Sequence, residues 1–330
     1  MNARFPDHDT IRTVLSLATR APSIHNSQPW RWRVGDESLH LYIDPHRFLP
    51  HTDPDNRDLL VSCGASLHHA VVALAALGWQ AKVHRLPNPL QPAHLAAVEV
   101  YPHPASELDI TLAAAIPRRR TDRRHYSWWP VPAADVTLMG SRAARAGVML
   151  RKVESLPKLQ DIVAQAVWQH ATDSEYLTEL TAWSGRYAAV AGVPARNTPP
   201  SDPTAPIPGR LFAGPALAQP PDTDAADDNA TVIALGTKDD DSLARLRAGE
   251  TTSLVLLTAT ALGLSSCPVT EPLEIAETRE ALRNDVFGDS GYPQMLLRVG
   301  WAPVNTDPLP STPRRPLGDV VTWLDGSAFE

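Results

Sequence analysis

Residues 21–30 read APSIHNSQPW, and this stretch separates the first predicted helix from the first predicted strand. Before it, apolar side chains recur at the spacing of one helical face: Ile11, Val14, Leu15 and Ala18. Pro22 ends the helix, because proline has no N–H and clashes with the preceding turn. Residues 30–34 then alternate as a strand does. We expect a polar loop suited to hydrogen-bonding a flat heterocycle. A helix cap followed by a turn would use the same residue types, so that alternative stays open.

Two mostly apolar stretches, residues 59–78 and 243–263, predict helices that are buried on all sides. They overlay at an offset of 185 residues through shared glycines and a shared Ala-Leu-Gly ending: Gly64 and Gly78 with Gly249 and Gly263. An Arg-Ala pair recurs earlier at an offset of 125 residues, at 20–21 and 145–146. An insertion between the two matches would explain the difference. The pattern predicts two diverged copies of one α+β unit.

The remaining periodic stretches predict a mixture of helices and strands that fits this α+β unit. Helices are expected at 10–20, 133–146, 159–187 (one or two) and 275–285. Strands are expected at 39–43, 80–84, 96–101, 148–153, 231–235 and 294–299.

The composition changes sharply between residues 192 and 221, which contain nine prolines, and an acidic run follows at 222–228. A packed core cannot form from such a stretch. It is either a flexible linker or an ordered lid that lies across the body of the protein. The acidic run is expected to be solvated.

A second unusual stretch, residues 113–126, reads AAAIPRRRTDRRHY and holds five arginines within seven residues. Guanidinium groups match phosphate oxygens with two parallel hydrogen bonds, and Thr121 adds a hydroxyl donor. The formal net charge of the chain is −7. A lone basic cluster in an acidic protein favours a specific anion site, although a solvated basic face or an RNA-binding arm remains possible.

The length, net charge and cysteine count of the chain limit the classes of protein to which it can belong. The 330 residues suffice for one large or two ordinary domains, and a net charge of −7 argues against a protein that binds a nucleic-acid backbone. Two cysteines, Cys63 and Cys267, predict no disulfide framework. The apolar runs are short for a membrane span and the first residues are polar, so we expect a soluble cytoplasmic protein.

Residues 46–58 contain several groups that could ligate a metal: His46, His51, Asp53 and Asp55. None of them form a pair at helical i, i+4 spacing, and Pro50 and Pro54 indicate a solvated loop. We therefore expect no metal site. Cys267 is expected to be a small packing residue rather than a redox thiol.

Five segments resemble the FMN-dependent nitroreductase superfamily, and more narrowly its Acg-type branch of actinobacterial NAD(P)H nitroreductases. They are APSIHNSQPW, PRRRTDRRHY, ALGLSSCPVTEP, LLRVGWAP and RRPLGDVV, spread from residue 21 to residue 321. The resemblance implies the nitroreductase-like α+β fold, which is ordinarily a homodimer with FMN at the interface. Acg-type chains look like such a dimer fused into one polypeptide. The implied halves are residues 1–112 and 113–330, with a Pro-rich lid inserted around 157–228.

The resemblance also assigns roles to residues, and it implies one FMN per chain. Arg119, Arg120 and Thr121 match the phosphate-binding segment, and Arg314 or Arg315 matches a second basic residue on the same phosphate. Arg123 matches the basic residue near N1 and O2 of the flavin, where a cation stabilises negative charge. The ring itself would be contacted by Pro22, Ser23 and Asn26 along its face and by Pro268, Val269 and Thr270 at its N5 edge.

Two departures from the family pattern matter. The usual Glu-Gly after the N5 strip is replaced here by Thr270-Glu271, which puts the ordinary N5 contact in doubt. The first half has no matching arginine cluster, so a second, pseudo-symmetric site would lack a phosphate anchor.

The implied function is that of an oxidoreductase that passes hydride through flavin N5, with no catalytic side chain required. The donor would be NAD(P)H or another reductant, and the acceptor a nitro compound, a quinone or a similar molecule. A protein that stores FMN under a lid without turnover is the alternative, and a flavin-dependent dehydrogenase of a biosynthetic intermediate is a third. Small molecules are the expected partners, with no nucleic acid or membrane, and the expected assembly is a monomer that mimics a dimer.

Overall fold

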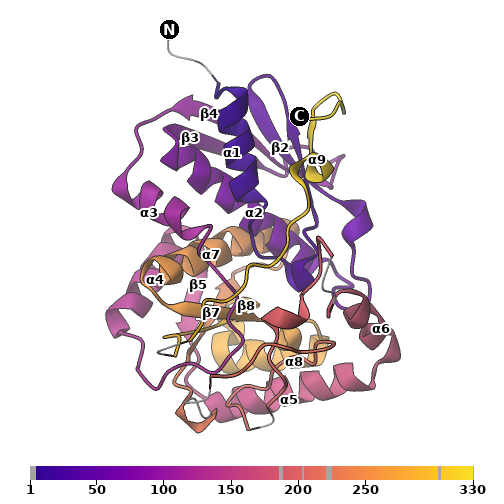
Figure 1. The fold of residues 1–330 in the computed structure, drawn as a ribbon, viewed down its shortest axis with the longest axis vertical. Helices are drawn as coiled ribbons and strands as arrows, with labels where there is room; N and C mark the ends of the chain where they lie inside the picture. The colour runs from indigo at the N-terminus through magenta and orange to yellow at the C-terminus, as the bar shows by residue number, and fades with distance from the viewer. Residues whose placement is uncertain (1–4, 186–188, 203, 221–224, 304–305, 330) are drawn as a thin grey trace.

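The structure is a computed structural model, and it describes residues 5–185, 189–202, 204–220, 225–303 and 306–329. In the described residues, a mixed sheet lies in the upper part of the molecule and an antiparallel sheet in the lower part, with two long helices between them (Figure 1). The chain is thus of mixed α and β structure, as the sequence predicts.

The upper sheet has the strand order β3-β4-β2-β1-β9. Its strands are β1 (Trp30–Val34), β2 (Ser38–Ile43), β3 (Trp79–Arg85), β4 (His94–Pro102) and β9 (Val321–Trp323). In β1 the side chains alternate between buried and exposed, because Trp30, Trp32 and Val34 face the core. The first four strands pair antiparallel, whereas β9 pairs parallel with β1.

The lower sheet has the order β5-β6-β8-β7. Read from its other edge, β7-β8-β6-β5, it matches the upper order β3-β4-β2-β1 when β5, β6, β7 and β8 correspond to β1, β2, β3 and β4. Its strands are β5 (Met149–Lys152), β6 (Thr231–Thr237), β7 (Ser265–Val269) and β8 (Tyr292–Gly300). All of its pairs are antiparallel. The corresponding pairs β2–β4 and β6–β8 each carry a register shift, at Leu41/Tyr42 and at Leu235/Gly236.

The two central helices are α2 (Arg57–Ala76) and α7 (Ser242–Ala261), and both bounds of α7 lie 185 residues after those of α2. The helices cross at Gly64 and Gly249. A Cβ atom on Gly64 would lie 2.1 Å from the Leu246 carbonyl oxygen, and one on Gly249 would lie 2.0 Å from that of Val61. Only glycine therefore allows the two backbones to approach this closely.

By length and composition alone, α2 could span a membrane. However, 78% of its most apolar window is buried inside the protein, as expected for the core helix of a folded protein. The expectation that every apolar run is too short to span a bilayer was therefore too simple, and burial is the better criterion.

Within the described part of the chain, seven further helices surround this core, and most fall where the apolar spacing predicts them. They are α1 (His8–Ala18), α3 (Glu107–Ala115), α4 (Ala133–Arg145), α5 (Leu156–Thr172), α6 (Ser174–Ala182), α8 (Ala276–Leu282) and α9 (Leu317–Val320). Helix α8 continues as a π-helical turn over Arg283–Phe287. Residues 186–188, at the end of the predicted 159–187 helical stretch, lie outside the described residues.

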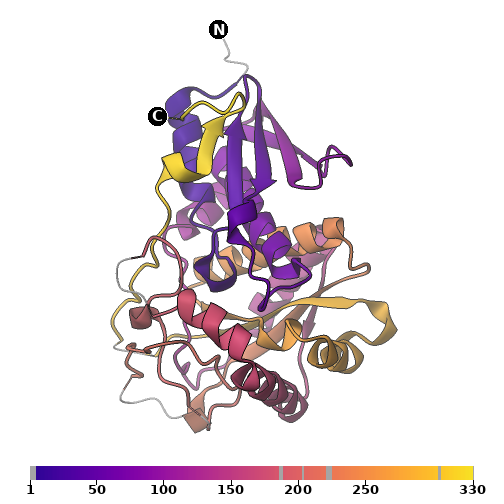
Figure 2. The same ribbon diagram turned by 90° about the vertical axis from the view of Figure 1, so that its right-hand side faces the viewer.

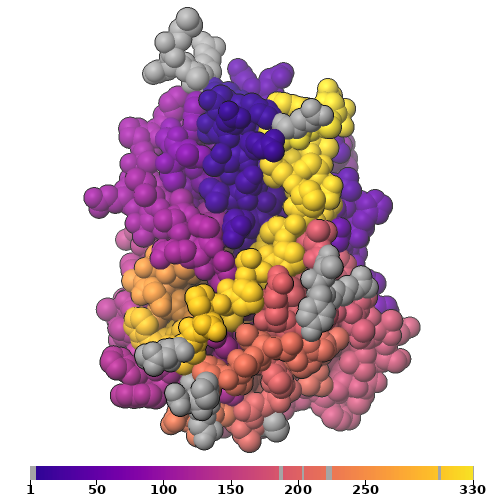
Figure 3. Space-filling model, viewed as in Figure 1, coloured from indigo at the N-terminus to yellow at the C-terminus, as the bar shows by residue number. Residues whose placement is uncertain are grey.

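The C-terminal stretch connects the two parts of the molecule. After β8 it leaves the lower sheet, runs over the surface and joins the upper sheet as β9 (Figures 1 and 3). Figure 2 shows this yellow segment beside the first strands of the chain. Arg314 and Arg315 lie on this stretch, so the last described part of the chain brings them to the first loop.

The Pro-rich insertion is hydrogen-bonded to itself and to the first loop where it is described. The Ala216 and Leu217 N–H groups donate to the Thr198 carbonyl, and the Gly192 N–H donates to the Asn26 carbonyl at 3.2 Å. The insertion lies next to the C-terminal stretch on the face shown in Figure 3.

Candidate active site

A cavity of about 170 Å³ lies where the first loop and α2 face the end of β7, with the insertion over it. Seven of the predicted site residues line it: Pro22, Ser23, Thr121, Arg123, Pro268, Val269 and Thr270. They come from three stretches that are far apart in sequence. The structure therefore brings together the 22–23, 121–123 and 268–270 segments, as the resemblance implies.

A smaller cavity of about 30 Å³ adjoins this one, since Thr121 lines both. We call this cavity the anion pocket because of its positively charged lining, and we define it by five residues: Arg20, Arg119, Arg120, Thr121 and Arg314. None of the described residues that line it carries a carboxylate. The Nε atoms of Arg20, Arg119 and Arg120 are buried without a hydrogen-bond partner. Four guanidinium groups thus surround a space that no described acidic side chain neutralises.

The lowered pKa values of two arginines indicate that positive charges repel one another in this pocket. Burial lowers the pKa of Arg119 to about 10, and the neighbouring Arg120 and Arg20 add to the effect. Burial and the same cluster lower the pKa of Arg314 to about 9. Like charges held close together in a desolvated site destabilise one another, so a bound anion would relieve the repulsion.

Arg314 is fixed in place by the first helix and the loop that follows it. Its guanidinium donates to the backbone carbonyls of Thr19 at 3.0 Å and Arg20 at 2.9 Å, and to Asn26 Oδ1 at 2.9 Å. Asn26 Nδ2 in turn donates to the Gly192 carbonyl at 3.0 Å. Asn26 lines neither cavity, and its contacts position Arg314 and the insertion.

Arg315 points elsewhere. Its guanidinium donates to Asp44 Oδ2 at 2.8 Å, and its backbone N–H donates to Gln28 Oε1 at 2.9 Å. Both Arg315 and Asp44 are buried, and neither lines the two cavities. Of the two alternatives, Arg314 is the one that the structure places at the anion pocket.

The five arginines of residues 118–124 have different roles, which their spacing could not separate. Arg119 and Arg120 line the anion pocket, and Arg123 lines the larger cavity with its guanidinium 4.9 Å from the Phe212 ring centroid. Arg124 forms a buried ion pair with Asp122 at 2.9 Å. Arg118 is exposed.

The sequence prediction missed residues that reach the cavity from the insertion and from the first loop. Arg210 donates to Thr270 Oγ1 at 3.1 Å and pairs with Glu274. His25 lies beside it, and burial together with Arg210 lowers the pKa of His25 to about 3. Since these partners are 60 or more residues apart in the chain, local spacing contains no signal for them.

Glu271, where the family has glycine, also lines the larger cavity. Its Oε1 atom lies 3.1 Å from His170 Nδ1, and the His170 ring stacks on Tyr176 at 3.7 Å. Its carboxylate is therefore held by helix α5.

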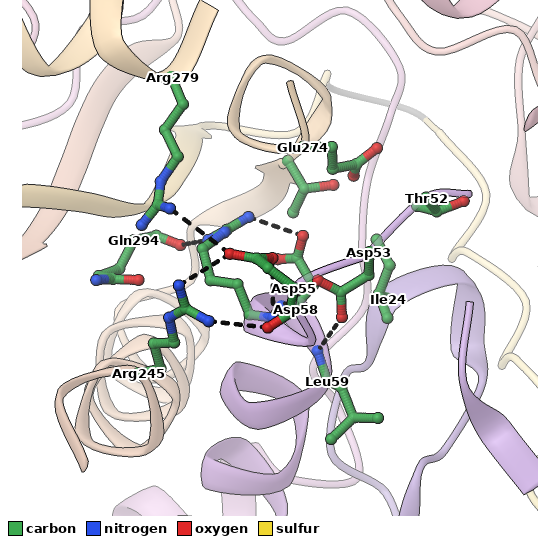
Figure 4. A network of polar contacts seen from close by, with 12 residues as sticks. Ile24, Thr52, Asp53, Asp55, Asp58, Leu59, Arg245, Glu274, Arg279 and Gln294 are labelled. Carbon is green, nitrogen blue, oxygen red and sulfur yellow. Dashed lines mark hydrogen bonds and ion pairs between the residues drawn. The ribbon is translucent and has the colours of Figure 1, made fainter. Parts of the chain in front are cut away.

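A polar network lies at the start of α2, on another wall of the cavity (Figure 4). Asp53 accepts hydrogen bonds from the Asp58 N–H at 2.9 Å and the Leu59 N–H at 2.7 Å. Asp58 lines the cavity and accepts from the Arg57 guanidinium at 2.7 Å. Burial raises the pKa of Asp53 to about 6 and that of Asp58 to about 8.

The outer part of this network links the 46–58 loop to α7 and α8. Arg245 on α7 pairs with Asp55 at 2.8 Å, and Arg279 on α8 lies 3.9 Å from the same carboxylate (Figure 4). The acidic residues of the 46–58 loop thus cap α2 and pair with arginines. Among the described residues, no three His, Cys, Asp or Glu side chains gather as a metal site would require.

A scan against protein-family models found no match. Curated relatives from Mycobacterium tuberculosis match nearly the whole chain. The protein named "Putative NAD(P)H nitroreductase Rv3131" is 67% identical over 323 residues, covering 98% of this chain and 94% of that protein. The protein named "Putative NAD(P)H nitroreductase acg" is 36% identical over 321 residues, covering 94% and 95%. "Uncharacterized protein Rv3127" is 34% identical over 324 residues, covering 94% and 92%.

Solved structures show a weaker likeness. A nitroreductase with bound FMN from Desulfitobacterium hafniense matches 65% of this chain and 98% of its own, with 14% identity and a TM-score of 0.41. A nitroreductase with bound FMN from Bacteroides fragilis matches 59% and 90%, with 16% identity and a TM-score of 0.39. The assignment rests on the curated relatives and their coverage: the chain belongs to the Acg-type branch of the nitroreductase superfamily.

Proposed function

We propose that this protein is an FMN-binding oxidoreductase. The observation that carries the proposal is the pair of connected cavities. One is an anion pocket of four arginines with no carboxylate among its described lining residues, and the other is a larger space lined by segments of both halves. A flavin mononucleotide has the same two parts, a phosphate and a flat ring system. The buried guanidinium Nε atoms without partners support a fit to a phosphate in this pocket.

The lining residues divide naturally between the two ends of FMN. Arg119, Arg120, Thr121 and Arg314 would hold the phosphate, with Asn26 positioning Arg314. Pro22 and Ser23 would contact the ring, Arg123 would lie towards N1 and O2, and Pro268, Val269 and Thr270 would lie at the N5 edge. We leave Arg315 out of the binding set because Asp44 holds it.

FMN, when bound, supplies hydride acceptance at N5 from NAD(P)H or another donor and electron transfer to a nitro compound, a quinone or a similar acceptor. The protein contributes position and charge. Arg123 brings a cation into the cavity, and Arg210 orients the Thr270 hydroxyl by donating to its oxygen.

We further propose that the chain is a fused pseudo-dimer that holds a single FMN. The identical strand order and the 185-residue spacing of the central helices support the duplication. The same offset puts Arg85 where the second half has Thr270, and Glu250 where the first half has Ala65. Arg85 and Glu250 form a bidentate ion pair, at 2.6 and 2.7 Å, so they would fill the mirror-image cavity.

The Pro-rich insertion would act as a lid in this arrangement. Pro199, Pro200, Ile207, Pro208 and Phe212 all line the larger cavity. This cover favours one alternative function, in which the protein stores FMN and reacts little with NAD(P)H, because a nicotinamide needs an open ring face to stack on.

The test is an absorbance spectrum of the purified protein, taken without oxygen before and after addition of NADPH or NADH. Loss of the flavin absorbance on mixing supports the oxidoreductase. A flavin that bleaches only with dithionite supports storage. Colourless protein that takes up no added FMN would overturn both.

A further inference from the structure

Five charged side chains are buried together beside the larger cavity, and two of them, Asp58 and Arg210, line it. Three are carboxyls, Asp53, Asp58 and Glu274, and two are guanidinium groups, Arg57 and Arg210. The Asp53, Asp58 and Arg57 residues are at most 4% exposed, and the Glu274 and Arg210 side chains at most 8%. With all three carboxyls ionised, the group would carry one more negative charge than positive. Because an uncompensated buried charge is costly, the balance favours one retained proton.

The hydrogen bonds show which carboxyl retains it. Asp53 accepts two backbone N–H groups, which favour its charged form, and the ion pair with Arg210 lowers the pKa of Glu274 although burial opposes this. Asp58 has Arg57 as its partner, but it is fully desolvated and repelled by both other carboxylates. These effects together raise the pKa of Asp58 to about 8.

Two other groups that line the cavity, His25 and Cys267, are poorer proton donors at neutral pH. His25 has a pKa lowered to about 3 and is neutral, and the pKa of the Cys267 thiol is raised by burial. The Glu271 carboxylate is paired with His170. His125 lies 3.0 Å from Asp202 and 3.5 Å from Asp228.

We propose that Asp58 is a catalytic residue that gives its proton to the acceptor during reduction. The proposal rests on the proposed oxidoreductase function and adds a proton source to it. Reduction of a quinone to a hydroquinone adds two electrons and two protons. The Asp58 O–H bond breaks and its electron pair stays on the carboxylate, while a new O–H bond forms on the acceptor oxygen. The hydride of the overall reaction brings both electrons and the other hydrogen nucleus.

The structure also explains how the resulting carboxylate is tolerated. Arg57 lies 2.7 Å from Asp58 Oδ2 and is itself anchored by the Gln294 backbone carbonyl. The acceptor class that fits is one whose oxygen needs a proton as electrons arrive, such as a quinone or a nitro group.

The first experiment is infrared spectroscopy of the full chain, with and without FMN, over a pH series. Wild-type protein should show the C=O stretch of a protonated carboxylic acid at pH 7, where Asp53 is mostly ionised, and lose it as the pH rises through about 8. Asp58→Asn should remove this band. Asp55→Asn is the matched control, since Asp55 is half-exposed, pairs with Arg245 and does not line the cavity; it should retain the band.

The second experiment measures reoxidation of dithionite-reduced protein by benzoquinone in a stopped-flow instrument. Asp58→Asn should slow this step by about 10²- to 10⁴-fold, the usual contribution of a general acid. It should leave the FMN dissociation constant unchanged, and Asp55→Asn should reoxidise at the wild-type rate. Glu274→Gln balances the charges of the group, so it should move the infrared titration of Asp58 to lower pH. This variant tests the proposal even where Asp58→Asn does not fold.

Absence of the band in wild type at pH 7, its persistence at that pH in Asp58→Asn, or an unchanged reoxidation rate would each overturn the proposal. Failure of the wild type to bind FMN would instead overturn the proposed function and the transfer step with it. The infrared titration would still decide whether Asp58 holds the proton.

Discussion

At the scale of single residues, the anion pocket shows how far a cluster of arginines can be interpreted from sequence. The spacing of residues 118–124 predicts an anion site, but it could not say that Arg124 is neutralised by Asp122 or that Arg118 faces solvent. Such assignments depend on which partner lies nearby in the fold. His25 and Arg210 escaped prediction for the same reason, because their partners come from distant segments.

Replacing Arg119 tests the pocket directly. Arg119→Ala should weaken FMN binding by about 1.5–3 kcal/mol, the contribution of a hydrogen bond to a charged group. Arg118→Ala, one residue away and exposed, is the matched control and should bind FMN as the wild type does. The two affinities can be compared by fluorescence titration of FMN, and equal affinities would remove Arg119 from the site.

The raised pKa of Asp58 also has a consequence for stability. An aspartate in an unfolded chain has a pKa of about 3.9, whereas Asp58 in the folded protein has one of about 8. Between these values Asp58 binds its proton only in the folded state, so its contribution to the free energy of unfolding should fall as the pH rises from about 4 to 8. Buried histidines with a lowered pKa, such as His25, act in the opposite direction below about pH 6.5.

Urea unfolding at pH 5 and pH 8 measures this dependence. Between pH 5 and pH 8 the free energy of unfolding should change less favourably in the wild type than in Asp58→Asn, because the variant lacks the contribution of Asp58 and shares that of every other group, including Asp53. An equal change in the wild type and the variant would contradict the account.

At the scale of elements, amphipathic and apolar patterns predicted most helices and strands to within a few residues. Helix α3 was missed because its side chains are mostly small and its apolar Leu108 and Ile110 are exposed. Strands β7 and β9 were missed as well. Strand β9 has three residues and exists because β1 offers it an edge, which no local pattern records.

The crossing of α2 and α7 gives a prediction at this scale. Gly64→Ala should destabilise the protein by about 1–3 kcal/mol, because the added methyl group would force the two helix backbones apart. Gly140→Ala, in α4, is the control. Its Cβ would meet only Leu150, at 3.9 Å, so the change should be neutral or stabilising by up to about 1 kcal/mol. Chemical denaturation of the two variants measures the difference, and similar stabilities would contradict it.

At the scale of the whole molecule, the two sheets share one strand order, but among the described residues only one of the two related positions between the central helices and the sheets holds the larger cavity. We therefore expect one FMN per chain, since Arg85 and Glu250 occupy the mirror-image position. Equilibrium titration with FMN should reach saturation at one equivalent, and saturation at two would contradict the single-site account.

Ligand binding should also stabilise the whole protein. FMN at a hundred times its dissociation constant should add about 2.7 kcal/mol to the free energy of unfolding. Inorganic phosphate should stabilise the FMN-free protein as well, because it fits the anion pocket alone. Arg119→Ala should lose most of the phosphate effect, and a phosphate effect that survives in that variant would place the anion elsewhere.

The path of the C-terminal stretch has a consequence for biosynthesis. Arg314 is translated after every strand of the lower sheet and after the first four strands of the upper sheet, yet it completes the anion pocket beside Asn26. A nascent chain on the ribosome therefore lacks one wall of this pocket until residue 314 has been made. On the function proposed above, capture of the flavin would be a late event that reports whether the tail has reached β1.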